Sequence, residues 1–156
     1  MQNEFDSGPL GEASLDRKEH ARSLKRQRDF FDNDVHYVLG IFEKKSGDLV
    51  GHLFIEFVVR SNIQSAVVAY HIFNNHWRKG FGREAVLAGL KFAFATLSLH
   101  RLEARVLPHN KVSVWFTKKL GFRYEGTACR LIKINGRWED LLIFALTKED
   151  LRNGTH

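Results

Sequence analysis

Apolar and polar positions divide the chain into runs with the two-residue period of strands and runs with a helical period. Residues 35–42 and 49–59 are rich in β-branched and aromatic side chains, and a short polar segment containing Gly47 separates them. Because glycine and small polar residues suit a tight turn, these two runs are predicted to be adjacent antiparallel strands. A third β-rich run, at 64–73, follows a polar break. The first half of the chain is therefore predicted to form a sheet.

A helical period appears at 84–97, where apolar residues recur every three or four positions. It appears again between Asn110, a suitable N-cap, and Gly121, a suitable residue to end a helix. Residues 14–31 combine helix-forming residues with many basic side chains, which predicts a third helix with a solvated basic face.

The remaining runs are strand-like. Residues 101–106 alternate apolar and charged side chains, which predicts a strand with one polar face. The runs 122–134 and 138–146 flank Asn135-Gly136, a strong hairpin signal. Strands with one central strand–helix–strand crossover predict an α+β (mixed α/β) fold, in which helices pack on a mixed sheet.

The composition predicts one domain over residues 1–156. The chain is 44% hydrophobic and contains only two prolines, so it has enough apolar material for a core and no proline-rich linker to divide it. Residues 1–13 show no period and are expected to be a mobile leader. The single cysteine excludes an internal disulfide, and the absence of a long apolar run argues against a membrane span. A cytoplasmic location is the default expectation.

The charge of the chain favours an anionic partner. Lysine and arginine exceed the acidic residues to give a net charge of +6 and a pI near 9.6. Such a balance suits nucleic acid, a ribosome surface or a phosphorylated cofactor, and it does not choose among them.

The turn at Gly80-x-Gly82 lies between basic residues and immediately precedes a predicted helix. In isolation, two glycines before a helix indicate only a tight turn. The segment is not a Walker loop, and it lacks the third glycine of a dinucleotide fingerprint. Unpaired N–H groups at a helix N-terminus nevertheless bind anions well, so a diphosphate site is the alternative.

Four motifs follow one another: Trp77-x-x-Gly80-x-Gly82-x-Glu84-Ala85, Pro108-His109-Asn110-x-x-Ser113, Lys119-Leu120-Gly121-Phe122-x-x-Glu125-Gly126, and Asn135-Gly136-x-Trp138 with Asp140. In this order and spacing they resemble the GNAT N-acetyltransferase superfamily and, within it, the ribosomal-protein alanine N-acetyltransferase branch of RimJ/RimL type. The resemblance covers residues 35–147.

The resemblance implies a GNAT-like twisted mixed sheet with helices on both faces, in which the parallel strands at 64–73 and 101–106 splay apart around acetyl-CoA (CoA). It implies that the backbone of Ile72 and Phe73 pairs with the pantetheine arm, and that Asn110 and Ser113 lie near the thioester. The pyrophosphate is expected on the turn formed by Arg78, Lys79, Gly80, Phe81 and Gly82, with Arg83 beside it.

Acetyl transfer needs a neutral amine, a polarised carbonyl and a proton for the leaving thiolate. Many members of the superfamily place a tyrosine acid seven positions after the asparagine, where this chain has Thr117, so the resemblance points to Ser113 as the acid instead. His71, on the strand that borders the cleft, is the first candidate for the base because histidine is the usual proton acceptor near neutral pH. Deprotonation through water is equally open, and the further candidates are Glu103 and Glu56.

Each of these residues also has a purely structural explanation. Asn110 is a good N-cap whatever its chemistry, and His71 is an ordinary strand residue in that interpretation. Trp77 and Trp138 are predicted to be packing residues. Cys129 is predicted to be half-buried in a strand, without a reactive role.

The superfamily pattern begins with a strand and a helix ahead of the segment at 14–31, and that first strand is expected to be missing here. Its absence would expose the backbone edge of 35–42, which proteins usually cover. A homodimer, residues 1–13 or a longer N-terminus would provide the cover.

The acceptor is expected to be the N-terminal amine of a protein or peptide, such as a ribosomal protein, with association with the ribosome as a corollary. A small amine, such as a polyamine or an aminoglycoside, is the enzymatic alternative; a net charge of +6 disfavours polycations. A non-catalytic module that binds acetyl-CoA or RNA is the alternative from another class.

Overall fold

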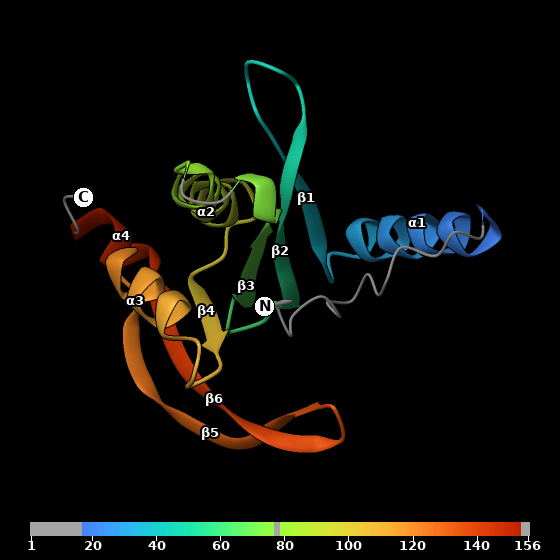
Figure 1. Cartoon of the computed structure of the whole chain (residues 1–156). Coiled ribbons are helices and arrows are strands. Elements are labelled where there is room, and N and C mark those ends of the chain that lie inside the picture. Colours follow the sequence, from blue (N-terminus) through green and yellow to red (C-terminus); the bar gives the residue numbers. More distant parts are fainter. Residues whose placement is uncertain (1–16, 77–78, 154–156) are drawn as a thin grey trace.

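The computed structural model describes residues 17–76 and 79–153 of the chain. The sheet contains six strands in the order β1-β2-β3-β4-β6-β5, and only β3 and β4 run parallel. This is the predicted mixed sheet with helices around it (Figure 1). In chain order the elements are α1 (Arg17–Asp32), β1 (Tyr37–Phe42), β2 (Leu49–Val59), β3 (Ser65–Ile72), the 3₁₀ turn η1 (Asn74–His76), α2 (Phe81–Lys91), the π-helical segment η2 (Phe92–Thr96), β4 (Arg101–Val106), α3 (Lys111–Lys119), β5 (Arg123–Ile134), β6 (Arg137–Thr147) and α4 (Lys148–Asn153).

The parallel strands β3 and β4 pair over three positions only. Ser65 lies opposite Arg101, and the last pair joins Val67 and Glu103. Both strands continue beyond this pair, β3 to Ile72 and β4 to Val106, so they separate toward their carboxyl ends. The expected splay is therefore confirmed, and it opens toward the turn that leads into α2.

The core lies on the face of the sheet that α2 covers, called here the α2 face. Leu53 and Ile55 of β2 point to this face together with Val68 of β3, and they pack with Leu90 of α2. Gly89 permits the close approach of α2, because a Cβ built there would lie 2.6 Å from a methyl carbon of Leu53. Alternation places the neighbouring residues of β2 and β3 on the opposite side, called here the open face.

Asp34 connects three segments next to β1. The Tyr37 hydroxyl donates to one Asp34 oxygen at 2.6 Å, and the Arg60 guanidinium donates to both Asp34 oxygens. Arg60 also donates to the carbonyl of Leu97 at 2.6 Å, which joins the β2–β3 turn to the end of η2. The hydrogen bond from Arg60 lowers the pKa of Asp34, and the second bond from Tyr37 acts in the same direction.

Replacing Asp34 by asparagine is expected to lower the free energy of unfolding by about 1 kcal/mol at pH 7, because a partly exposed charged bond is lost. Asparagine tolerates the left-handed backbone at this position (φ 57°), so the backbone is preserved. Since the folded pKa is lowered, the contribution is present above the ordinary aspartate pKa of about 3.9 and lost as the pH falls through the folded value. Denaturant titrations at several pH values measure it. The exposed Asp32→Asn variant is the charge-matched control, and an equal loss there would contradict the assignment.

Two predictions about burial are wrong. Trp138 was expected to pack, but 60% of its surface is exposed. Cys129 was expected to be half-buried and is exposed. The reason is that pairing between β5 and β6 is interrupted after Ala128, and the far part of the hairpin extends beyond the core (Figure 1). Trp77 lies outside the described residues.

β1 forms one edge of the sheet in the described part of the chain, as expected. The leader at 1–13 lies outside the described residues. None of the described helices combines the length and apolar character needed to span a bilayer.

Candidate active site

The turn before α2 has the backbone that an anion site requires. Gly80 adopts φ 86°, and no heavy atom of the described residues lies within 4 Å of the position of a Cβ built on it. Its carbonyl accepts the N–H groups of Arg83 and Glu84 at 3.1 and 3.3 Å. The N–H groups of Phe81 and Gly82 make no hydrogen bond within the described chain. These two donors sit at the positive end of the α2 dipole.

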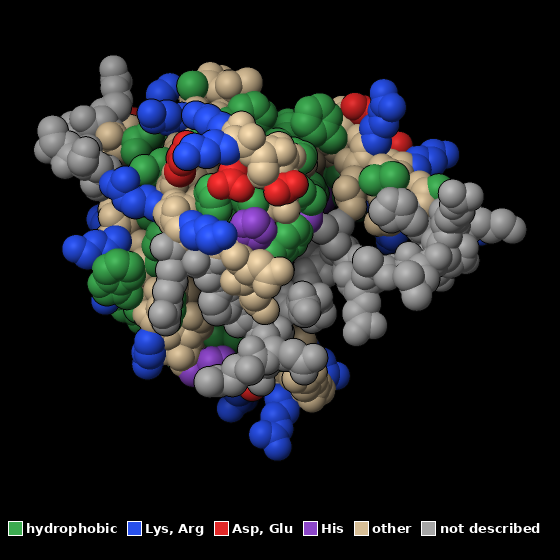
Figure 2. Space-filling view, turned by 45° about the horizontal axis from the view of Figure 1, so that its top comes forward, with side chains coloured by type: hydrophobic (Ala, Val, Ile, Leu, Met, Phe, Trp, Pro, Cys, Tyr) green, Lys and Arg blue, Asp and Glu red, His purple; other side chains and the backbone are tan. Residues whose placement is uncertain are grey.

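Basic side chains surround this turn. Lys79 and Arg83 are exposed, whereas Arg78 lies outside the described residues. A shallow, open depression runs from the turn along α2. Its lining residues are Gly80, Arg83, Glu84, Leu87, Ala88 and Lys91. Figure 2 shows many Lys and Arg side chains and few acidic ones on one face of the molecule. The turn therefore combines unpaired donors, positive charge and open space.

The carboxyl end of β3 lies directly against the turn. A Cβ built on Gly82 would lie 3.6 Å from both Ile72 and Tyr70. The register pairs Ile72 with Gly51 of β2, and the N–H of Phe73 donates to Val50 at 2.9 Å. These contacts use the β2 side of β3. The other side faces the space between β3 and β4, which gives an extended ligand a strand edge to follow.

The N-terminus of α3 brings Asn110 and Ser113 together. The Asn110 Oδ1 accepts the N–H of Ser113 at 3.0 Å, so the capping role of Asn110 is real. The Ser113 hydroxyl is half-buried and makes no hydrogen bond within the described chain. Phe116 packs against Tyr70 of β3 with ring centroids 5.2 Å apart, which holds α3 over the splayed strands. Burial raises the pKa of Tyr70 to about 12, so this phenol stays protonated.

An Asn110→Asp variant separates the capping role of this residue from a role in ligand binding. Aspartate caps a helix as well as asparagine does, so the melting temperature is expected to stay within about 2 °C of wild type. The amide donors are lost and a negative charge is added, so affinity for acetyl-CoA should fall about tenfold in isothermal titration. Asn110→Ala should lose stability as well, by about 1 kcal/mol. Wild-type affinity in the aspartate variant would leave Asn110 with the capping role only.

His71 lies on the open face of β3. It stands opposite His52 of β2, and its ring centroid is 5.6 Å from that of Phe73. Burial lowers the pKa of His52, and the nearby His71 adds to the effect. His71 is four residues beyond Val67, the last residue of β3 that pairs with β4, and this corresponds to about 13 Å along a strand. The structure therefore places His71 toward the wide end of the splay.

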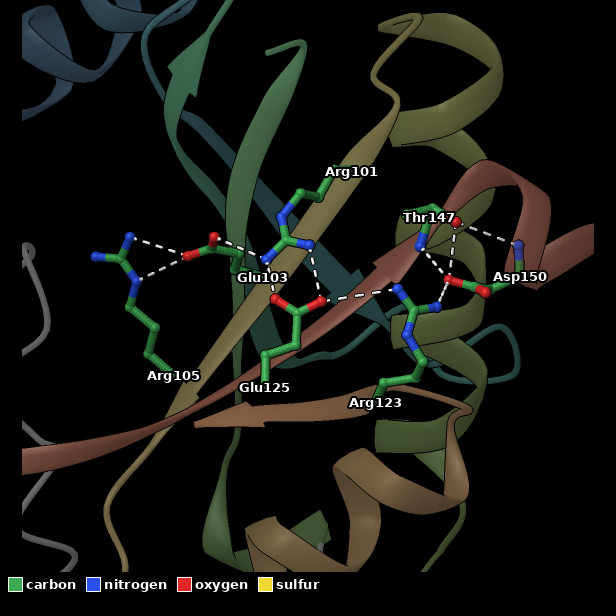
Figure 3. A network of polar contacts seen from close by, with 7 residues as sticks. All are labelled: Arg101, Glu103, Arg105, Arg123, Glu125, Thr147 and Asp150. Atoms are coloured by element: carbon green, nitrogen blue, oxygen red, sulfur yellow. Dashed lines mark hydrogen bonds and ion pairs between the residues drawn. The ribbon is translucent and has the colours of Figure 1, made fainter. Parts of the chain in front are cut away.

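Glu103 lies at the narrow end of the splay, where two arginines bind it. Arg101 reaches it at 3.2 Å and Arg105 at 3.1 Å. Arg101 also binds both oxygens of Glu125, at 3.0 and 2.5 Å, and Figure 3 shows this network continuing through Arg123. The arginines stabilise the ionised carboxylates, and the bond from Arg101 lowers the pKa of Glu125.

The network also has a structural function. It connects β4 to β5 across the intervening β6, where Ala145 is fully buried between Glu103 and Arg123 in the register. At its far end, Arg123 binds Asp150, which also accepts the Thr147 hydroxyl at 2.8 Å (Figure 3). The charges of this part of the open face are thus largely compensated by one another.

A family model described as an acetyltransferase (GNAT) domain matches residues 3–123. The chain belongs to the GNAT family. It is 34% identical over 129 residues to the probable N-acetyltransferase YjcK of Bacillus subtilis, covering 83% of this chain and 71% of the relative. It is 30% identical over 126 residues to the [ribosomal protein uS5]-alanine N-acetyltransferase of Escherichia coli, covering 81% and 65%.

Other comparisons extend this picture of the GNAT domain. The chain is 25% identical over 130 residues to a spermidine N(1)-acetyltransferase of Vibrio cholerae, covering 80% of this chain and 73% of the relative. Among solved structures, RimJ of Mycobacterium smegmatis in complex with CoA-disulfide superposes with a TM-score of 0.79 at 28% identity, covering 86% of this chain and 63% of that one. The resemblance to the RimJ/RimL type is therefore confirmed.

The cofactor of a GNAT domain is acetyl-CoA, whose thioester supplies the acetyl group and the leaving sulfur. The described residues fit such a ligand. The turn at Gly80 offers unpaired N–H groups in open space, as a pyrophosphate needs. The separated edge of β3 offers the backbone along which an extended arm can lie.

Proposed function

We propose that this protein transfers an acetyl group from acetyl-CoA to the N-terminal α-amine of a peptide or protein, directly and within a ternary complex. The observation that carries the proposal is the separation of β3 and β4 beyond the pair Val67–Glu103. Tyr70, which lies against Gly82 of α2 and Phe116 of α3, covers this separation on the α2 face. On the open face Ala69 of β3 is exposed, so an acceptor has its own route to the same point.

In this proposal the N–H groups of Phe81 and Gly82 bind the pyrophosphate, with Lys79, Arg83 and Arg78 supplying charge. Ile72 and Phe73 present the strand edge for the pantetheine arm. At the reacting end, Asn110 orients the ligand through its amide group. Ser113 supplies the proton that the departing sulfur takes, since its hydroxyl has no hydrogen-bond partner among the described residues.

The charges of this protein favour an acceptor with a single amine over a polyamine acceptor. A polyamine carries several positive charges and needs several carboxylates that are not already paired. On the described open face around the splay, Glu103 and Glu125 are bound to arginines, which leaves Glu56 as the uncompensated carboxylate. The net charge of +6 also disfavours a polycation. The similarity to a spermidine acetyltransferase keeps a small polyamine as the second candidate.

A panel of acceptors tests the proposal. Release of free CoA is measured with short peptides that have a free N-terminus, with the same peptides acetylated at the N-terminus, and with spermidine and an aminoglycoside. Turnover is expected with the free peptides and not with the blocked ones, and mass spectrometry should locate the acetyl group on the terminal nitrogen. A higher kcat/KM for spermidine than for every peptide would identify a polyamine, and not a peptide, as the acceptor. Binding of acetyl-CoA without release in any mixture would indicate a non-catalytic module.

A further inference from the structure

Glu56 stands next to the point where β3 and β4 part. The register places Glu56 of β2 opposite Val67 of β3. Val67 is in turn opposite Glu103 of β4, in the last pair that the parallel strands make. The two glutamates therefore lie on either side of Val67 at the narrow end of the splay, Glu56 on β2 and Glu103 on β4.

The side chain of Glu56 belongs to the open face. Its neighbour Ile55 is fully buried in the core on the α2 face, and alternation turns Glu56 the other way. Phe54 points to the same side and lies opposite the exposed Ala69 of β3. An acceptor that approaches over Ala69 thus meets Glu56 at the end of its path, whereas the cofactor would enter from the wide end.

The environment of Glu56 differs from that of Glu103. Its carboxylate is half-buried, and no hydrogen bond or ion pair reaches it within the described chain. Burial raises its pKa, and His36 opposes this shift weakly. Glu103, in contrast, accepts hydrogen bonds from both Arg101 and Arg105.

Several titratable groups face Glu56 from the neighbouring strands. His36 precedes β1 and accepts the N–H of Phe57 at 3.3 Å. His52 lies on the same face of β2, and His71 on the same face of β3, both about 13 Å away along their strands. Glu103 faces it from β4 together with its arginines. Among these groups it is His36 whose charge acts on Glu56, and it favours the ionised form.

We propose that Glu56 is the general base of the reaction and that the acceptor amine reaches it across the open face. This inference rests on the proposed function and assigns the role for which His71 was the first candidate. It also explains a feature of the sequence, since Glu56 is the single acidic residue in the otherwise apolar or neutral run of β2.

Glu56 takes one proton from the acceptor ammonium and later passes it to water. The neutral nitrogen forms the C–N bond to the acetyl carbon while the C–S bond breaks. The departing sulfur takes the hydroxyl proton of Ser113, and Ser113 regains the second proton that the nitrogen loses. The products are the N-acetylated acceptor and CoA thiol.

The test compares Glu56→Gln with wild type using the acceptor that the panel identifies. At pH 7, kcat/KM is expected to fall about 100-fold, within the usual range for loss of a general base. In the wild type, kcat/KM should rise with pH as Glu56 loses its proton, at a pH above the ordinary range of glutamate pKa values. This rising limb of the pH profile should be absent in Glu56→Gln. The Kd for acetyl-CoA should stay within about twofold. Glu43→Gln, at the exposed β1–β2 turn, is the matched control with unchanged kinetics.

The free energy of unfolding gives a second readout. A general base and a structural carboxylate at position 56 predict changes of opposite sign in the Glu56→Gln variant. Because the folded pKa of Glu56 is raised, its ionisation destabilises the fold as the pH rises through that value. Glu56→Gln should therefore be at least as stable as wild type at pH 8. A structural carboxylate would show a loss instead, and such a loss together with a retained limb would overturn the assignment.

The outcomes separate the two proposals. If wild-type protein releases no CoA with any amine, the proposed function fails and the role of Glu56 fails with it. If wild type is active and Glu56→Gln keeps both its rate and its limb, only the role of Glu56 is overturned. Loss of the limb in His71→Asn, with the limb retained in Glu56→Gln, would transfer the role to His71.

Discussion

Replacing Gly80 by valine is expected to weaken acetyl-CoA binding about 100-fold, which corresponds to about 2.7 kcal/mol. The residue sits at φ 86°, where a side chain costs about 1–2 kcal/mol, so the turn is driven toward another backbone conformation. In the observed conformation the new side chain would enter the open space in front of the N–H groups of Phe81 and Gly82. Both effects remove the site for the pyrophosphate. Isothermal titration with acetyl-CoA measures the change.

The hairpin turn between β5 and β6 supplies a matched control. Gly136 has φ 81° and, like Gly80, has no heavy atom from the described part of the chain within 4 Å of a built Cβ. Gly136→Val should therefore carry the same backbone strain and lose similar stability while leaving the Kd unchanged. If both variants bind acetyl-CoA as wild type does, the turn before α2 is not the pyrophosphate site. If both lose affinity equally, the effect is one of stability.

Replacing Ser113 by alanine is expected to lower kcat about 100-fold at saturating acetyl-CoA, with the Kd for acetyl-CoA within about twofold of wild type. The variant loses only a hydroxyl that has no partner within the described chain. The cap of α3 is retained, because Asn110 accepts the backbone N–H of residue 113 and not its side chain. The expected effect thus falls on the chemical step, and single-turnover release of CoA measures it.

Ser113→Thr is the informative companion, because it keeps a hydroxyl at the same position and should recover much of the lost rate. Both variants should melt within a few degrees of wild type, since Ser113 is only partly buried. Unchanged single-turnover rates in Ser113→Ala would reject this residue as the acid. Thr117 would not replace it readily, because only 5% of its surface is exposed.

Much of the fold follows from local patterns. The bounds of β2 and β4 agree with the predicted runs, because alternation and β-branched residues determine such strands independently of distant contacts. Asn110 caps α3 and Gly80 takes a left-handed conformation for equally local reasons. These positions also carry the cofactor motifs, which explains why the sequence alone pointed to acetyl-CoA.

Burial and charge compensation were less predictable. An apolar side chain such as Trp138 is buried only if some other segment reaches it, and the β5–β6 hairpin extends past the core. The partners of Glu103 come from β4 itself, but its network continues to Glu125 on β5 across an intervening strand. No spacing rule in the sequence links those positions, since they meet through the strand order of the sheet.

Motifs of neighbouring residues were enough to indicate the family and, through that resemblance, its cofactor, because the glycine turn, the asparagine cap and the strand runs are encoded locally. The grounds for proposing Glu56 over His71 and Glu103 as the base come from the tertiary structure alone. The register shows which of them borders the narrow end of the splay, and the packing shows which carboxylate remains uncompensated. Those two properties depend on strands brought together from distant parts of the chain, and that is the physical reason why the sequence left the choice open.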